Sequence, residues 1–79
     1  MGQLKQYCLA RIVQLLHPPE MYDGWRINRR LPQVGDVGTI VEILQVPGLP
    51  NKYILESSAS DGTTIWLGDF DAEEIEPAD

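Results

Sequence analysis

The chain has 79 residues, of which 43% are hydrophobic and 23% are charged, and its formal net charge is −6 at pH 7. These proportions are ordinary for a soluble globular protein, and we expect residues 1–79 to form a single domain. No apolar run approaches the ~20 residues that a membrane-spanning helix needs. The single cysteine, Cys8, cannot form an internal disulfide, which predicts a reducing, cytoplasmic environment.

Prolines and glycines divide the chain into five short runs that are rich in β-branched and aromatic residues. The runs span residues 7–16, 36–46, 52–57, 63–70 and 73–76. The first run could form a helix on composition alone, but Ile12, Val13 and the double proline that follows favour a short strand. Five short strands with regular turn signals are typical of a small all-β barrel or sandwich.

Two of the connections between these runs have recognisable turn chemistry. Asp61-Gly62 lies between the third and fourth runs. This dipeptide tolerates the positive φ angles of a two-residue hairpin turn, so we expect the two strands to pair antiparallel. The segment 47–51 carries two prolines and predicts a slightly longer loop between the second and third runs.

Side-chain alternation in the third and fourth runs predicts which face is buried. If Glu56 is to stay out of the core, the opposite face of its strand must be the buried one. Trp66 is then expected on the outer surface, because the apolar residues on either side of it point the other way. The expected core residues are Tyr53, Leu55, Ile65 and Leu67.

The segment "VGDVGTIVEI", residues 34–43, contains two glycines at the start of a strand, where glycine is usually unfavourable. We interpret Gly35 as a residue in the left-handed conformation of a tight turn. Gly38 is expected to let another strand or side chain approach closely where a small barrel closes. Asp36 is expected to accept a hydrogen bond from a backbone N–H two residues further on, which would fix the turn.

The same segment carries a resemblance to known families. Over residues 7–77 the chain resembles the SH3-like barrel, and more narrowly small bacterial proteins of uncharacterised function with a Gly-Asp-x-Gly-Thr-Val turn. The turn also resembles the KOW motif of ribosomal and transcription-elongation proteins. The matching segments are "VGDVGTIVEI", "YILES", the Asp-Gly hairpin, "TTIWL" and "DAEEIEP". The resemblance implies five antiparallel strands, and it implies an immunity or inhibitor role because some relatives occur beside toxin-like proteins.

The chain departs from that pattern by a long loop between the first two strands, at residues 17–33. Loops carry function more often than the strands beneath them, and aromatic and arginine side chains are enriched at the energetic centres of interfaces. In one interpretation the loop binds a partner. In the other, Trp25 or Tyr22 folds back to cap the barrel, the arginines pair with nearby acids, and the loop covers Trp66. The candidate partner-binding residues are Tyr22, Trp25, Arg26, Arg29, Arg30 and Trp66.

Charge and composition rank the possible functions. No phosphate-binding glycine loop, catalytic dyad or usual zinc ligand set is evident, so we expect no enzyme activity, no cofactor and no metal. Twelve acidic residues against six basic ones disfavour a nucleic-acid or ribosome-associated role, which the KOW-like turn would suggest. We therefore expect a protein-binding module, either an adaptor or an inhibitor. It would use the 17–33 loop and the acidic surface that follows Lys52.

Overall fold

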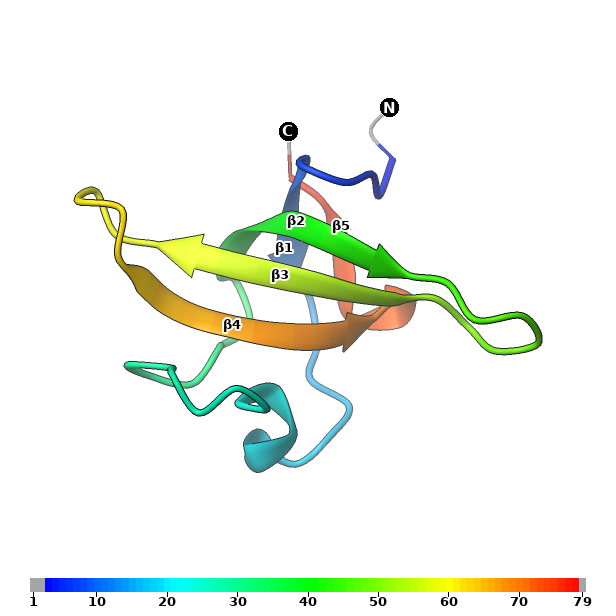
Figure 1. Cartoon of the computed structure of the whole chain (residues 1–79), viewed down its shortest axis with the longest axis horizontal. Helices are drawn as coiled ribbons and strands as arrows, with labels where there is room; N and C mark the ends of the chain where they lie inside the picture. Colours follow the sequence, from blue (N-terminus) through cyan, green and yellow to red (C-terminus); the bar gives the residue numbers. More distant parts are fainter. Residues whose placement is uncertain (1–2, 79) are drawn as a thin grey trace.

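All five expected strands are present in the computed structural model, which describes residues 3–78 (Figure 1). They are β1 (Leu9–Ile12), β2 (Val37–Leu44), β3 (Lys52–Ser58), β4 (Thr64–Asp71) and β5 (Ile75–Pro77). Two short 3₁₀ helices, η1 (Pro19–Tyr22) and η2 (Ala72–Glu74), precede β2 and β5. The strands form one antiparallel sheet in the order β4-β3-β2-β1-β5, which confirms the all-β class. No helix within residues 3–78 is long and apolar enough to cross a membrane.

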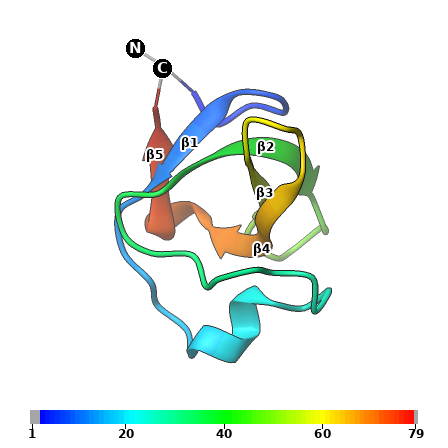
Figure 2. The ribbon, with the colours of Figure 1, turned by 90° about the vertical axis from the view of Figure 1, so that its left-hand side faces the viewer.

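The sheet is strongly curved, and β2 runs between its two neighbours along the curve (Figure 2). The first part of β2 pairs with β1, and its remainder pairs with β3. Val41 interrupts the ladder with β3 as a bulge, and bulges bend a strand and increase its twist. The side chain of Gln6 donates to the Val41 carbonyl over 2.9 Å. Because β4 and β5 stand at the two ends of a linear order, the strand pairing within residues 3–78 does not close a complete barrel.

The two hairpin turns follow the local sequence. In the β2–β3 turn, Leu49 N–H donates to the Val46 carbonyl over 3.0 Å, and Gly48 supplies a positive φ of 83°. The β3–β4 hairpin is antiparallel as expected, but its loop has three residues rather than two. Ala59 N–H pairs with the Thr63 carbonyl over 2.8 Å, and Gly62 takes the positive φ of 89°.

The prediction that Trp66 lies outside is wrong, since this side chain is 0% exposed. Trp66 pairs with Ser57, whereas Thr64 pairs with Ser58, so Ile65 is an extra residue in β4. A shift of one residue transfers a whole strand's side chains to the other face. Tyr53 and Leu55 are buried as expected, but Ile65 and Leu67 are only half-buried.

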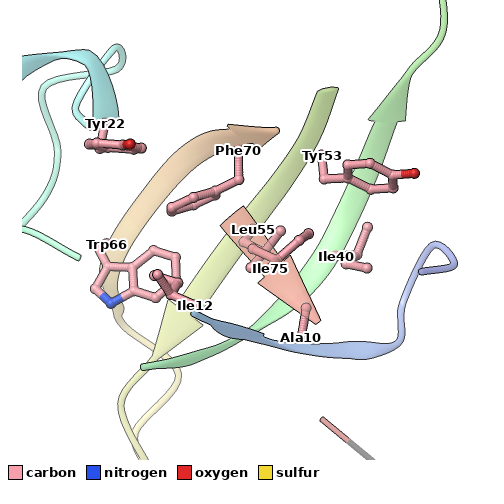
Figure 3. Packing of buried hydrophobic residues seen from close by; sticks show 9 residues of the cluster. All are labelled: Ala10, Ile12, Tyr22, Ile40, Tyr53, Leu55, Trp66, Phe70 and Ile75. Carbon is pink, nitrogen blue, oxygen red and sulfur yellow. The ribbon is translucent and has the colours of Figure 1, made fainter. Parts of the chain in front are cut away.

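The core lies on the concave face of the sheet and draws side chains from all five strands and from η1 (Figure 3). Gly38 provides the close approach expected of it, because an added Cβ would lie 2.9 Å from Cη2 of Trp66 and 3.0 Å from the Glu56 carbonyl oxygen. Gly35 has the expected positive φ, at 95°. The core residues are Ala10, Ile12, Tyr22, Ile40, Tyr53, Leu55, Trp66, Phe70 and Ile75.

Candidate functional site

The long loop is attached to the core by Tyr22 (Figure 3). Its ring is 2% exposed and stacks on Phe70, with ring centroids 5.2 Å apart. Gly68 makes room for this contact, because a Cβ there would lie 2.9 Å from the Tyr22 carbonyl oxygen. Of the two aromatic residues of the loop, Tyr22 is therefore the one that folds back. Tyr22, a predicted partner-binding residue, is thus buried in the core rather than exposed on the loop.

The hydroxyl of Tyr22 reaches the fully buried carboxylate of Glu74, which lies in η2 near the end of the sequence. It donates to Glu74 Oε2, which also accepts from Leu16 N–H over 2.9 Å. Glu74 Oε1 accepts from Asp71 N–H over 2.8 Å, so both oxygens are satisfied despite 0% exposure. Burial, followed by the hydrogen bond to Glu74, raises the pKa of Tyr22 to about 12. This contact ties the loop to η2.

Asp71 extends the same network towards the surface. Its Oδ2 lies 2.8 Å from His17 Nε2, and its Oδ1 lies 2.5 Å from Lys52 Nζ. The hydrogen bond from Lys52, and then that from His17, holds the pKa of Asp71 below its ordinary value. Suitable metal-ligand atoms of His17, Asp71 and Glu74 lie within 4.8 Å of one another. A metal ion would have to displace the N–H and O–H donors that already occupy both carboxylates, so this cluster fits a structural network better than an ion site.

The loop also covers the free edge of β4. Arg29 N–H donates to the Ile65 carbonyl over 2.8 Å, and Asn28 Oδ1 accepts from Leu67 N–H over 2.8 Å. The Asn28 amide donates to the Tyr22 carbonyl over 2.9 Å, which joins the edge contact to the buried anchor. These bonds satisfy backbone groups that an edge strand would otherwise leave exposed.

Between its two attachments the loop forms a closed bend at residues 23–28. Arg26 N–H donates to the Asp23 carbonyl over 3.1 Å, and Asn28 N–H donates to Asp23 Oδ1 over 3.3 Å. Arg26 has a positive φ of 58°, an uncommon conformation for a residue with a side chain. Trp25 lies on this bend and is 47% exposed. Backbone hydrogen bonds therefore fix the segment that presents Trp25 to solvent.

The three arginines of the loop have different surroundings. Arg30 Nη1 lies 2.6 Å from Asp36 Oδ2, an oxygen that also accepts from Trp66 Nε1 over 3.1 Å. Arg26 and Arg29 are exposed, and neither forms a salt bridge within residues 3–78. The predicted arginine cluster thus separates into one residue that fixes the loop and two whose charges are unpaired in the described chain.

Asp36 stabilises the glycine turn by accepting from a different backbone N–H than the one expected. Its carboxylate accepts from Gln33 N–H over 3.0 Å, three residues before it rather than two residues after it. Desolvation by burial raises its pKa. The hydrogen bond from Arg30, together with those from Gln33 and Trp66, outweighs that effect and leaves the pKa below its ordinary value.

Apolar side chains surround Trp25 in sequence and remain exposed with it. Burying such a surface in a complex would be favourable, because removal of apolar area from water drives most association. The exposed large apolar residues between positions 21 and 34 are Met21, Trp25, Ile27, Leu31 and Val34.

The acidic residues that follow Lys52 do not all contribute to one open face. Glu74 is buried, Asp71 is paired with His17 and Lys52, and Glu76 lies 3.2 Å from Arg11. Asp79 lies outside the described residues.

In comparisons with known proteins, the chain matches no family model, and it shows no significant similarity to a curated protein or to a solved structure.

Sequence reasoning found the loop and its arginines but missed the residues that shape it. Asp23 and Asn28 hold the bend, and neither was a candidate. The dipeptide Asp23-Gly24 is a turn signal that predicts such a bend locally. The contacts of Asn28 with Tyr22 and Leu67 have no local signal, because they depend on the loop lying against β4.

Proposed function

We propose that the protein is a non-catalytic binding module that docks a partner protein on the bend at residues 23–28. The observation that carries this proposal is the half-exposed Trp25 on a backbone held by Asp23 and Asn28. A large aromatic side chain on a rigid bend loses little conformational freedom when it is buried by a partner, so more of the contact energy contributes to affinity.

The composition around Trp25 also supports a protein partner. Tryptophan and arginine are enriched among the residues that dominate interface energies, and here Trp25 lies beside Arg26 and four positions before Arg29. Exposed Met21 and Ile27 add apolar area to the same loop.

A non-catalytic role agrees with the chemistry of the cluster of His17, Asp71 and Glu74, whose residue types resemble those of an active site. The carboxylate of Glu74 accepts three hydrogen bonds, and that of Asp71 lies within hydrogen-bond distance of His17 and Lys52. Groups engaged in this way hold the loop in place and are not available to transfer protons to a substrate. We further propose a cytoplasmic location, on the evidence of the lone thiol of Cys8.

Adaptor and inhibitor roles both fit a binding module of this kind. An inhibitor role would rest on the resemblance to proteins encoded beside toxins and on the net charge of −6. The partner's identity decides between them: a basic nuclease favours inhibition, and a subunit of an assembly favours an adaptor.

The experiment that tests the proposal is site-specific photo-crosslinking in the native cell. A photoreactive phenylalanine analogue at Trp25 is expected to capture a defined protein, which mass spectrometry then identifies. The same analogue at Leu49, which is 65% exposed on the β2–β3 turn, is the matched control and should not capture that protein.

The captured partner is then used in binding measurements. Trp25→Ala combined with Arg29→Glu is expected to leave the circular dichroism spectrum unchanged and to weaken binding by about tenfold or more. Unchanged affinity in this double variant, or equal capture from Leu49, would refute the loop as the binding site.

A further inference from the structure

We infer that the segment of the partner that contacts Trp25 is acidic, and that Arg26 and Arg29 pair with its carboxylates. This inference rests on the proposed function and adds the chemistry of the partner. The sequence alone is compatible with a basic partner, because the net charge is −6, and with an acidic partner, because the loop is rich in arginine. The pairing of individual charges in the fold distinguishes the two.

Half of the basic residues are paired with acidic residues of the same chain. Each of the three lies within salt-bridge distance of a carboxylate, and the pairs are Arg11 with Glu76, Arg30 with Asp36, and Lys52 with Asp71. Arg26, Arg29 and Lys5 form no salt bridge within residues 3–78. Two of these three free cations lie on or next to the bend that carries Trp25.

The contrast between Arg29 and its neighbour Arg30 is informative. Arg30 reaches Asp36, whereas Arg29 is held through its backbone N–H to Ile65, which leaves its guanidinium exposed. Arg26 is likewise exposed, and its backbone is fixed by Asp23. A guanidinium presents a planar set of donors that matches a carboxylate in bidentate geometry. Anchoring both backbones reduces the entropy lost when such a pair forms.

Acidic protein is favoured over nucleic acid as the source of the negative charge. Affinity for nucleic acid depends on neutralising many phosphates, and two free arginines on a chain of net charge −6 provide few such contacts. An acidic peptide that also carries an apolar side chain can use Trp25 and Ile27 as well, both of which are about half exposed.

The test is a selection from a random peptide display library with the full chain as bait. Peptides retained by the wild type and released by Arg26→Glu or Arg29→Glu are expected to carry net negative charge with at least one aromatic or aliphatic residue. Each single reversal should weaken binding of the selected peptides by about fivefold or more, and 0.5 M salt should weaken it further.

Lys5→Glu is the matched control, because it changes the net charge equally at an exposed cation outside the loop. It should alter affinity by less than about twofold, as expected for a charge remote from the contact. A random single-stranded RNA and DNA pool is tested in parallel.

Four results from these measurements on the isolated chain would each overturn the inference. The selected peptides could be neutral or basic, or no peptide could distinguish the wild type from the arginine variants. The nucleic-acid pool could bind more tightly than the peptides in an arginine-dependent way, or the chain could self-associate through contacts that either reversal abolishes. If the partner captured at Trp25 binds independently of Arg26 and Arg29, the inference fails while the proposed binding site stands. If Trp25 captures nothing, the proposed function itself fails.

Discussion

The hydroxyl of Tyr22 donates a hydrogen bond to the carboxylate of Glu74, a residue 52 positions later in the chain. The same hydroxyl accepts from His17 N–H over 3.0 Å, so it serves as donor and acceptor inside the protein. Hydrogen bonds to a buried charge are stronger than neutral ones, and removing one leaves the charge poorly solvated. This single group therefore connects the long loop to the last turn before β5.

We expect Tyr22→Phe to lower the free energy of unfolding by about 1.5–3 kcal/mol, because Glu74 would lose a donor and His17 N–H an acceptor. Urea unfolding at pH 7 measures the change. Tyr53→Phe is the matched control, since this tyrosine belongs to the same core but its hydroxyl bonds to nothing within residues 3–78. Equal effects of the two substitutions would contradict the role assigned to the Tyr22 hydroxyl.

Gly38→Val is expected to destabilise the fold by about 3 kcal/mol, near the upper end of what overpacking usually produces. The nearest atoms to an added Cβ are Cη2 of Trp66 and the Glu56 carbonyl oxygen, and the carbonyl belongs to a paired strand that cannot move aside cheaply. Thermal melting reports the loss. Gly24→Ala serves as control, because an added Cβ there meets nothing within 4 Å; its melting temperature should hardly change.

Asn28→Ala is expected to loosen the loop from β4 without unfolding the sheet. The substitution removes the acceptor for Leu67 N–H and the donor to the Tyr22 carbonyl, with an expected loss of about 1–3 kcal/mol. Hydrogen exchange by NMR provides the sharper measurement. The Leu67 amide should exchange at least about tenfold faster, since about 1.4 kcal/mol of local opening energy corresponds to that factor. Exchange of the Leu55 amide in β3 should accelerate only as far as the global stability falls.

Stability should fall in acid, partly because of Asp36. Its pKa is lower in the folded state than the ordinary value of about 3.9, so its contribution is full above that value and is lost as the pH falls through the folded pKa. Asp36→Asn should therefore destabilise the protein by about 1 kcal/mol at pH 7, a modest figure because Arg30 is partly exposed. The difference from the wild type should shrink below about pH 4.

Asp69 should show the opposite pH dependence. Burial raises its pKa, an effect that Lys52 partly offsets, and its Oδ1 has no hydrogen-bond partner within residues 3–78. A raised pKa means that the charged form is disfavoured in the fold, so acidification relieves that penalty. Asp69→Asn is thus expected to gain more stability at pH 7 than at pH 3 in urea titrations. A larger gain at pH 3 would refute this assignment.

The local sequence was sufficient to predict the five strands and the glycine turn. Strand positions follow from β-branched residues between prolines and glycines, and the positive φ at Gly35 follows from a backbone conformation that glycine adopts without a steric penalty. Alternation within β4 from Trp66 onward was also predictable, because Trp66, Gly68 and Phe70 are buried whereas Leu67 and Asp69 are only partly buried.

The orientation of that strand, by contrast, depends on one extra residue. The three-residue β3–β4 loop, continued without interruption, would place Leu67 opposite Leu55; the bulge at Ile65 places Gly68 there and turns Trp66 inward. The carbonyl of Ile65 is held by Arg29 from the distant loop. Tertiary contacts also decided that Tyr22 rather than Trp25 enters the core. Gly68 leaves room for the backbone of Tyr22, and the carboxylate of Glu74 accepts a hydrogen bond from its hydroxyl.

The sequence by itself determined where the chain extends and where it turns, because those preferences arise from each residue's own backbone and its nearest neighbours. Only the tertiary structure decided which face is buried and which aromatic side chain remains outside. Those outcomes depend on hydrogen bonds and packing between segments that are 30 to 52 positions apart, as in the pairs Asp36 with Trp66 and Tyr22 with Glu74.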